Sequence, residues 1–246
     1  MLNNLGIIQV RQDKNEADRR IVRKLGGKTL LELVVRRITD CQRLDEVVVV
    51  LHDDPLDRIR ALVPPDVPTF VSAQPDRLGQ CADAIERFRP RAVVRVCADN
   101  PFIDPVLVDR LVSTADAHPN CDYISYCSAD GRPAIQTHLG LFAEWCSAEA
   151  LRRACREARR PADRAAVTSY LYSHPELFNV RLIRLPAELD RDDVRLKIDF
   201  EEDWEHAQAI YEALGPDEWD LRRITDLLDH QPALRQRMAV LNRGNE

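Results

Sequence analysis

The apolar run VVVVL at residues 47–51 limits the possible folds of this chain more than any other feature. It carries no polar residue on either of its alternating faces, so a strand formed from it must be covered on both sides. Strands of this kind occur mainly in parallel sheets flanked by helices. Residues 5–10 (LGIIQV) and 92–97 (AVVRVC) have a similar apolar character. The sequence therefore predicts an α/β fold with parallel central strands.

Strand-like and helix-like segments alternate along much of the chain, as βαβ crossovers require. We expect a single domain over residues 1–246, with a mostly parallel sheet covered by helices. Residues 128–146 carry turn signals without a helical period, and we expect a small antiparallel excursion there. The expected strands are 5–10, 47–51, 69–72, 92–97, 122–127, 180–184 and 194–198. The expected helices are 29–40, 55–62, 80–88, 147–159 and 161–173, with others starting near residues 104, 201, 218 and 232.

Composition excludes several classes of protein. No apolar run is long enough to span a membrane, and the first residues lack the pattern of a secretion signal, so we expect a cytoplasmic protein with no membrane partner. The net charge of −6 argues against nucleic acid as a general partner. Seven cysteines occur without a C-x-x-C pair, which favours packed thiols over disulfides or a zinc cluster.

The loop after the first expected strand is basic in an otherwise acidic chain. Residues 11–28 contain seven Lys or Arg and three Asp or Glu, a local charge of +4. A loop in this position commonly holds phosphate in α/β proteins, and its charge favours an anionic ligand. A solvated loop that keeps the protein soluble is the alternative interpretation.

Two aspartates directly follow expected strands. Asp99 comes after the strand at 92–97, and Asp199 comes after the strand at 194–198. Ligands of open parallel sheets bind beyond the carboxyl ends of the strands, so both carboxylates can point into one cleft. Such a pair suits Mg²⁺, which is bound through a few oxygens and nucleotide phosphates. The alternatives are a turn residue for Asp99 and, with Glu202 three residues later, a helix cap for Asp199.

Several segments, in order along the chain, resemble the cytidylyltransferase family that activates sugars as nucleotide conjugates. QVR and LGGK near the start match the family's QAR and LGGK, and RVCADNPFIDP resembles RITGDCPLIDP. Farther on, GLFAEWCS resembles GLDVEVFS, and VRLKIDFEEDWEHA resembles LRLTVDTPEDLELI. The family includes spore-coat polysaccharide biosynthesis F proteins and the synthetases of CMP-linked sialic acid and ketodeoxyoctonate. The resemblance implies the Rossmann-like fold of nucleotide-diphospho-sugar transferases.

The resemblance also implies an activity, the transfer of CMP from CTP to an acidic or amino sugar with release of pyrophosphate, in surface-polysaccharide biosynthesis. Mg²⁺ is the implied cofactor, with Asp99 and Asp199 as its ligands. The implied catalytic residues are Arg11, Arg20, Asp99 and Asp199. The implied nucleotide-binding residues are Gln9, Arg11, Arg20, Leu78, Gly79 and Glu144.

A homodimer is a further expectation, because relatives commonly dimerise through the excursion. An alternating strand with one apolar face is easily buried against its symmetry mate. We therefore predict an interface through about residues 132–145. The apolar residues of this segment are Ile135, Leu139, Leu141, Phe142 and Trp145.

The chain departs from the family pattern mainly in the phosphate loop, where the family has GS-x-R-LPGK. Asp13 replaces its glycine, Glu16 its arginine and Asp18 its proline. Carboxylates repel a polyphosphate, and loss of glycine restricts the backbone. Elsewhere, Phe142 replaces an Asp and Ala166 a His. Two alternative functions therefore remain, a catalytically impaired homologue acting as a nucleotide-binding or regulatory subunit and a glycosyltransferase-like enzyme that uses a nucleotide sugar.

Overall fold

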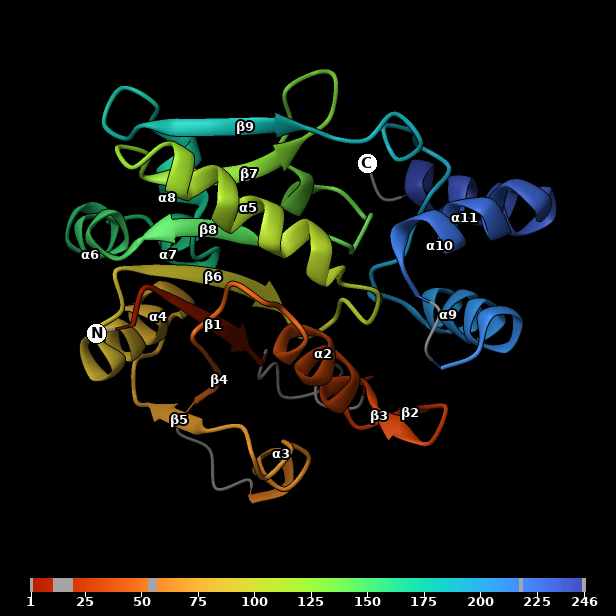
Figure 1. The fold of residues 1–246 in the computed structure, drawn as a ribbon, viewed down its shortest axis with the longest axis horizontal. Helices are drawn as coiled ribbons and strands as arrows, with labels where there is room; N and C mark the ends of the chain where they lie inside the picture. The colour runs from red at the N-terminus through yellow and green to blue at the C-terminus, as the bar shows by residue number, and fades with distance from the viewer. Residues whose placement is uncertain (1, 11–19, 53–56, 217–218, 245–246) are drawn as a thin grey trace.

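The computed structural model describes residues 2–10, 20–52, 57–216 and 219–244. The strands of its main sheet are β1 (Asn4–Gln9), β4 (Glu46–His52), β5 (Thr69–Ser72), β6 (Ala92–Cys97), β7 (Tyr123–Cys127), β8 (Glu144–Ser147) and β9 (Val180–Arg184). They lie in the order β5-β4-β1-β6-β8-β7-β9 (Figure 1). Strand β8 is antiparallel to its neighbours β6 and β7, while the other pairings are parallel. The mostly parallel sheet with a small antiparallel element is thus confirmed.

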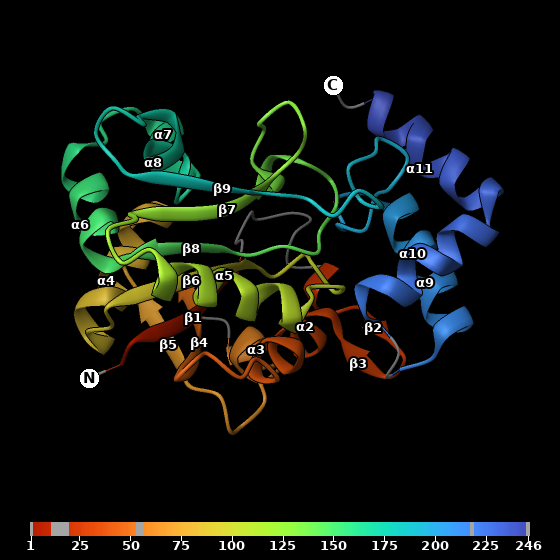
Figure 2. The same cartoon turned by 45° about the horizontal axis from the view of Figure 1, so that its top comes forward.

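Helices cover both faces of this sheet. Those described are α2 (Leu30–Thr39), α3 (Asp57–Arg60), α4 (Arg77–Phe88), α5 (Pro105–Ala117), α6 (Ala148–Glu157), α7 (Pro161–Ala165), α8 (Ser169–Ser173), α9 (Glu201–Leu214), α10 (Leu221–His230) and α11 (Pro232–Gly244). Apolar residues of α2, α5 and α9–α11 form one core cluster, and those of α4, α6 and α8 form another on the opposite face. Helices α9–α11 gather at the end of the sheet toward which the parallel strands run (Figures 1 and 2).

Two helix starts read from the sequence are confirmed. Thr29 Oγ1 accepts a hydrogen bond from Glu32 N (3.2 Å) at the start of α2. Asp104 accepts one from Val106 N (2.8 Å) at the start of α5. The second carboxylate oxygen of Asp104 accepts from Leu221 N (3.0 Å), so one residue connects the first turns of α5 and α10. These side chains satisfy backbone donors that have no partner inside the helix.

The strand expected at 194–198 is absent from the sheet, so that prediction was wrong. The backbone N–H groups of Leu196 and Lys197 both donate to the carbonyl of His138, at 2.9 and 3.1 Å. The N–H of Ile198 donates to the carbonyl of Asp99 (3.0 Å). The segment is therefore held by loop carbonyls instead of by a neighbouring strand.

The prediction of one continuous helix at 161–173 was also wrong, because this segment forms two helices, α7 and α8. Val167 and Thr168 lie between the two helices and are buried. The Thr168 hydroxyl donates to buried Glu144 (2.7 Å), which turns this stretch toward the core. Helix α4 begins about three residues earlier than expected, and α10 about three residues later. Asp76 and Asp220 cap these helices by accepting backbone N–H groups of the first turn.

Residues 128–146 place one strand, β8, in the sheet, together with a turn and the short helix η1 (Ala134–Gln136). Four of the five apolar residues that motivated the dimer prediction are directed inward, and the fifth, Ile135, is half-buried. Leu139, Leu141, Phe142 and Trp145 are at most 7% exposed, because the core of the chain itself covers them. The proposed interface through residues 132–145 therefore lacks the apolar face it was based on, and the homodimer stays a prediction.

A small hairpin joins β2 (Lys24–Leu25) to β3 (Lys28–Thr29) ahead of α2 and was not anticipated.

All seven cysteines are free thiols and six of them are buried, as their spacing predicted. In the described segments, no helix combines the length and apolar character needed to cross a membrane.

Gly140 generates a first prediction. Its φ of +66° lies in the left-handed region, and a Cβ there would come within 2.5 Å of Lys197 N. Gly131 has a similar φ of +87° but open space around it. We expect Gly131→Ala to lower the free energy of unfolding by about 1–2 kcal/mol. Gly140→Ala should cost at least about 3 kcal/mol, because steric overlap adds to the backbone strain.

Urea denaturation of both variants measures this difference. Equal losses for the two alanine variants would show that the 138–140 segment does not need to approach residues 196–197 so closely.

Candidate functional site at the carboxyl end of the sheet

Asp99 lies just beyond the carboxyl end of β6, in a turn closed by a hydrogen bond from Asn100 N to Cys97 O (3.3 Å). Its Oδ1 atom is buried without a hydrogen-bond partner in the described part of the chain. Its Oδ2 atom lies 3.7 Å from Lys197 Nζ. A buried carboxylate oxygen without a partner is costly unless a ligand uses it. The geometry therefore favours a ligand-binding role for Asp99 over a role in the turn alone.

A buried ion pair shapes the chain around Asp199. Arg195 Nε lies 2.6 Å from Asp203 Oδ1, and both side chains are almost fully buried. The Asp203 carboxylate also accepts the backbone N–H groups of Asp199 and Phe200, each at 2.9 Å. Asp203 therefore caps α9, and the alternative reading of Asp199 as the cap is wrong. The side chain of Asp199 is left to face the end of β6.

Lys197 lies between the two aspartates. Its Nζ atom is 2.9 Å from Asp199 Oδ1 and 3.7 Å from Asp99 Oδ2. Burial lowers the pKa of Lys197, but the two carboxylates raise it by more, so the ammonium stays charged. The two aspartates thus share one site, as their positions in the sequence suggested.

Further basic groups surround Asp199. Arg20 Nη1 donates to the backbone carbonyls of Ile198 and Asp199. Arg195 Nη2 lies 3.6 Å from Asp199 Oδ2, and His138 Nδ1 lies 3.8 Å from the same oxygen. Burial alone raises the pKa of Asp199, but His138 and the other basic groups hold it well below its usual range. This carboxylate is therefore ionised at neutral pH.

The two carboxylates fit a hard divalent cation in number and in chemistry. Within the described residues no group of three or more His, Cys, Asp or Glu is arranged to hold a metal. Mg²⁺ is, however, often held by one or two carboxylates, with water and substrate phosphates as its other ligands. Asp99 Oδ1 is an unused oxygen suited to this purpose. The Lys197 ammonium would compete with a metal ion for these two carboxylates.

The end of β1 brings Gln9 beside Asp99. Gln9 Nε2 donates to the carbonyl of Arg77 (2.8 Å), while its Oε1 is buried and has no partner within the described segments. Gln9, Arg20, Arg77 and Asp99 line a small cavity of about 20 Å³. Three predicted residues, Gln9, Arg20 and Asp99, are therefore brought together. Arg11 and the altered loop positions 13–19 lie outside the described residues.

Two other predicted nucleotide-binding residues pack against protein. Leu78 is fully buried in the core cluster of α4. Gly79 N donates to Asp76 Oδ1 (2.8 Å) in the cap of α4, and a Cβ on Gly79 would lie 3.1 Å from the Gln74 side chain. Neither residue lines the small cavity that contains Asp99 in its wall. Their geometry supports a role in shaping the loop before α4.

A cavity of about 210 Å³ opens beside Lys197, among the end of β6, η1 and α8. Arg95 and Asn100 are buried in its wall, and Arg95 Nε and Asn100 Oδ1 have no hydrogen-bond partner in the described chain. Phe142 and Ala166, two departures from the family pattern, also line it. The other polar residues of its wall are Arg77, Gln136, Thr137, Thr168 and Tyr172.

Glu144 lies behind this wall and is fully buried. Its Oε2 accepts a hydrogen bond from Arg95 Nη1 (2.8 Å), and its Oε1 accepts from the hydroxyls of Tyr123 (2.5 Å) and Thr168 (2.7 Å). Burial and the adjacent Glu144 carboxylate raise the pKa of Tyr123 well above its ordinary value, so the phenol remains a donor. Glu144 was predicted to bind nucleotide, but the structure places it where it orients Arg95.

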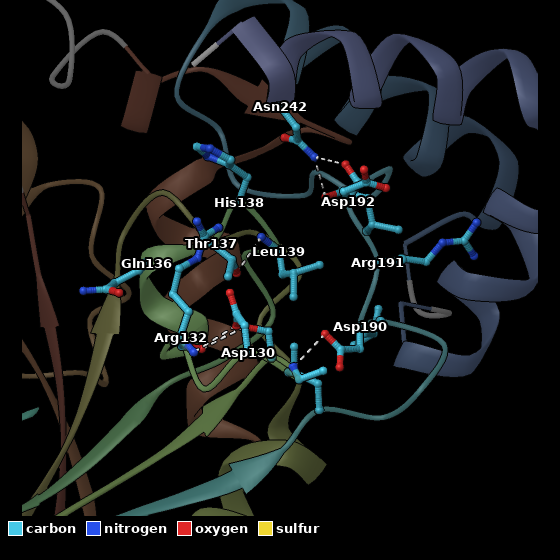
Figure 3. Close-up of a pocket in the computed structure, with 15 residues that line it drawn as sticks. Asp130, Arg132, Gln136, Thr137, His138, Leu139, Asp190, Arg191, Asp192 and Asn242 are labelled. Atoms are coloured by element: carbon cyan, nitrogen blue, oxygen red, sulfur yellow. Dashed lines mark hydrogen bonds between the residues drawn. The ribbon is translucent and has the colours of Figure 1, made fainter. Parts of the chain in front are cut away.

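A larger hollow of about 530 Å³ is lined in part by His138 (Figure 3). It lies between the loop after β7, the loop after β9 and helix α11 (Figures 1 and 3). Part of its wall is tied together by the hydrogen bond from Ala129 N to Asp190 Oδ1 (3.1 Å). Gln136 and Thr137 line both this hollow and the cavity beside Lys197, so the two spaces adjoin.

Sequence reasoning missed Lys197, Arg95 and His138. Lys197 had a signal, because a residue two positions before Asp199 in an extended segment faces the same side. Arg95 also had one, because a charge inside an apolar strand requires a buried partner. His138 had none, since the histidines of this chain show no ligand spacing.

The sequence model of the cytidylyltransferase family matches residues 5–244. The chain belongs to the cytidylyltransferase family. The spore coat polysaccharide biosynthesis protein SpsF of Bacillus subtilis is 28% identical to it over 237 residues, covering 93% of this chain and 95% of that protein. The family suggested by the motifs is therefore confirmed.

Several solved structures share the fold. A cytidylyltransferase from Leptospira borgpetersenii matches with a TM-score of 0.81 at 20% identity, over 95% of this chain and 96% of that one. A CMP:2-keto-3-deoxy-manno-octonic acid synthetase solved in complex with CTP matches with 0.67 at 14% identity, over 86% and 99%. Rv0371C of Mycobacterium tuberculosis, solved in complex with manganese, matches with 0.57 at 17% identity, over 84% and 98%. The expected nucleotide-diphospho-sugar transferase fold is thus confirmed.

The buried Arg95–Glu144 pair generates a second prediction. Glu144→Ala would leave the Arg95 guanidinium buried without its carboxylate, and we expect it to lower the free energy of unfolding by about 3–5 kcal/mol. The matched control is Asp66→Ala, which breaks the solvent-exposed pair of Asp66 with Arg36. Chemical denaturation should show almost no effect for that control. A similarly small effect of Glu144→Ala would contradict the role given to this pair.

Proposed function

We propose that this protein transfers CMP from CTP to an acidic or amino sugar, with release of pyrophosphate. The observation that carries the proposal is that Asp99 and Asp199 both lie within 4 Å of the Lys197 ammonium at the carboxyl edge of the sheet. A cavity lined by Arg77, Arg95 and Lys197 lies next to them. Membership in the cytidylyltransferase family supports CTP as the nucleotide. The name of the related SpsF supports a place in surface-polysaccharide biosynthesis.

The phosphates of CTP would bind near Gln9, Arg20 and the two aspartates. Asp99 and Asp199 are the residues that would hold Mg²⁺, the divalent ion proposed here. Bound there, it would neutralise charge that develops on the phosphates. Arg20 contributes in another way, because its hydrogen bonds to the carbonyls of Ile198 and Asp199 hold the second carboxylate in position.

The cavity beside Lys197 would receive the sugar. Arg77, Arg95 and Lys197 give it positive charge, and the hydroxyls of Thr137 and Tyr172 can bond to a polyol. A sugar hydroxyl oxygen placed there would form a bond to the α-phosphorus of CTP as the bond to pyrophosphate breaks, and the hydroxyl proton would pass to solvent water. Catalysis would come from positioning and from fixed charges near the phosphates.

The two alternative functions differ from this proposal in simple assays. A nucleotide-binding or regulatory subunit would bind CTP without releasing pyrophosphate. A glycosyltransferase-like enzyme would consume a preformed nucleotide sugar instead. A cytoplasmic location and a homodimer remain predictions attached to the same proposal.

A third prediction tests the proposal with Asp99→Asn. Pyrophosphate release from CTP, assayed with Mg²⁺ and a panel of acidic and amino sugars, should occur in the unchanged protein. The variant should lower kcat by at least about 100-fold, because it removes one charged group from the phosphate site. Asp66→Asn, at an exposed position away from the site, serves as the control. Turnover by Asp99→Asn within about threefold of the unchanged protein would refute the assigned role.

A fourth prediction concerns the altered loop. Asp13→Gly, Glu16→Arg, Asp18→Pro and Arg19→Gly together restore the family residues. If these positions face the phosphates, calorimetry should show CTP binding tightened by about five- to hundredfold. Gain of turnover as well would show that the loop alone limits the enzyme. Unchanged CTP affinity would show that the loop does not meet the phosphates.

A further inference from the structure

Lys197 places a positive charge where the proposed metal would bind. Its ammonium lies 2.9 Å from Asp199 and 3.7 Å from Asp99, and its side chain is only 18% exposed. Arg195 adds a second cation 3.6 Å from Asp199. The carboxylate pair is therefore largely neutralised by the chain itself before any metal arrives.

We propose that Lys197 keeps divalent metal away from Asp99 and Asp199 until an anionic ligand draws its ammonium aside. This inference rests on the proposed placement of the metal at these two carboxylates. A divalent ion bound to both would lie close to the ammonium, and charges of the same sign repel strongly in a partly buried site. The metal and the ammonium therefore compete for the same two carboxylates.

One carboxylate oxygen of Asp99 is available for a cation other than Lys197. Lys197 contacts the Oδ2 atom, whereas Oδ1 is buried with no partner in the described chain. A structural salt bridge alone would leave this oxygen without a partner among the described residues. A cation that bound through Oδ1 after Lys197 moved would satisfy it.

The Lys197 ammonium can also move into an adjoining cavity. Lys197 lines the cavity of about 210 Å³ that also presents Arg77 and Arg95. A lysine stem is flexible, so the ammonium can turn from the carboxylates toward a phosphate or carboxylate bound in that cavity. Lys197 would thus couple the arrival of an anionic substrate to the binding of metal, acting as a positioning residue for the ion.

The test measures Mn²⁺ binding to the protein alone, without CTP or sugar, by the loss of the free Mn²⁺ signal in electron paramagnetic resonance. Lys197→Thr removes the ammonium and should tighten Mn²⁺ binding by at least about tenfold. Lys197→Arg keeps a cation and should leave the affinity close to that of the unchanged protein. Lys197→Met, which preserves much of the apolar stem, provides a second neutral variant, and thermal unfolding checks that each variant is folded.

Two controls test whether any gain in Mn²⁺ affinity comes from the loss of the Lys197 charge at Asp99. Lys24→Thr removes the same charge from an exposed position in β2 and should change the affinity by less than about twofold. Adding Asp99→Asn to Lys197→Thr should abolish the gain. The proposal is overturned if neither neutral variant binds Mn²⁺ more tightly, if Lys24→Thr matches them, or if the gain survives Asp99→Asn. Because the assay contains no substrate, its result is independent of whether the protein transfers CMP.

Discussion

The buried ion pair of Arg195 with Asp203 is the interaction on which the site depends. It holds the start of α9 against the segment that carries Asp199, and the same carboxylate accepts the backbone N–H groups of Asp199 and Phe200. Hydrogen bonds to the carbonyls of Asp99 and His138 then attach this segment to the end of β6 and to the excursion. The close approach requires a glycine at position 140. Together these contacts bring Asp199 to Asp99 from a hundred residues away in the sequence.

A second buried pair, Arg95 with Glu144, serves the neighbouring cavity in a similar way. Buried ion pairs add little net stability, because desolvation offsets their attraction, but losing one partner is costly. Their value here is geometric, since each pair fixes a cation or a turn at the wall of the site. Glu144 is held by three donors and in turn holds Arg95 at the cavity. Glu144 is fully buried and is held by protein donors, whereas the side chain of Asp199 is 19% exposed.

Much of the fold could be predicted because its signals are local. Apolar runs such as VVVVL predict central parallel strands, and the capping residues Thr29 and Asp104 predict where helices begin. The failures occurred where tertiary contacts replaced local signals. Residues 194–198 have the alternation of a strand, but their N–H groups bond to loop carbonyls. The apolar residues of the excursion suggested a dimer face, but the core of the same chain covers most of them.

The sequence by itself determined the α/β class and the family, because both follow from short motifs and periodic patterns. It also predicted that Asp99 and Asp199 lie at the same edge of the sheet. Only the tertiary structure decided that Lys197 lies between those aspartates, that Glu144 is buried behind Arg95 and that Asp203, not Asp199, caps α9. These outcomes depend on distances between segments far apart in the chain. Sequence patterns indicate which side chains face a common edge, whereas burial and packing determine which of them meet a ligand and which meet each other.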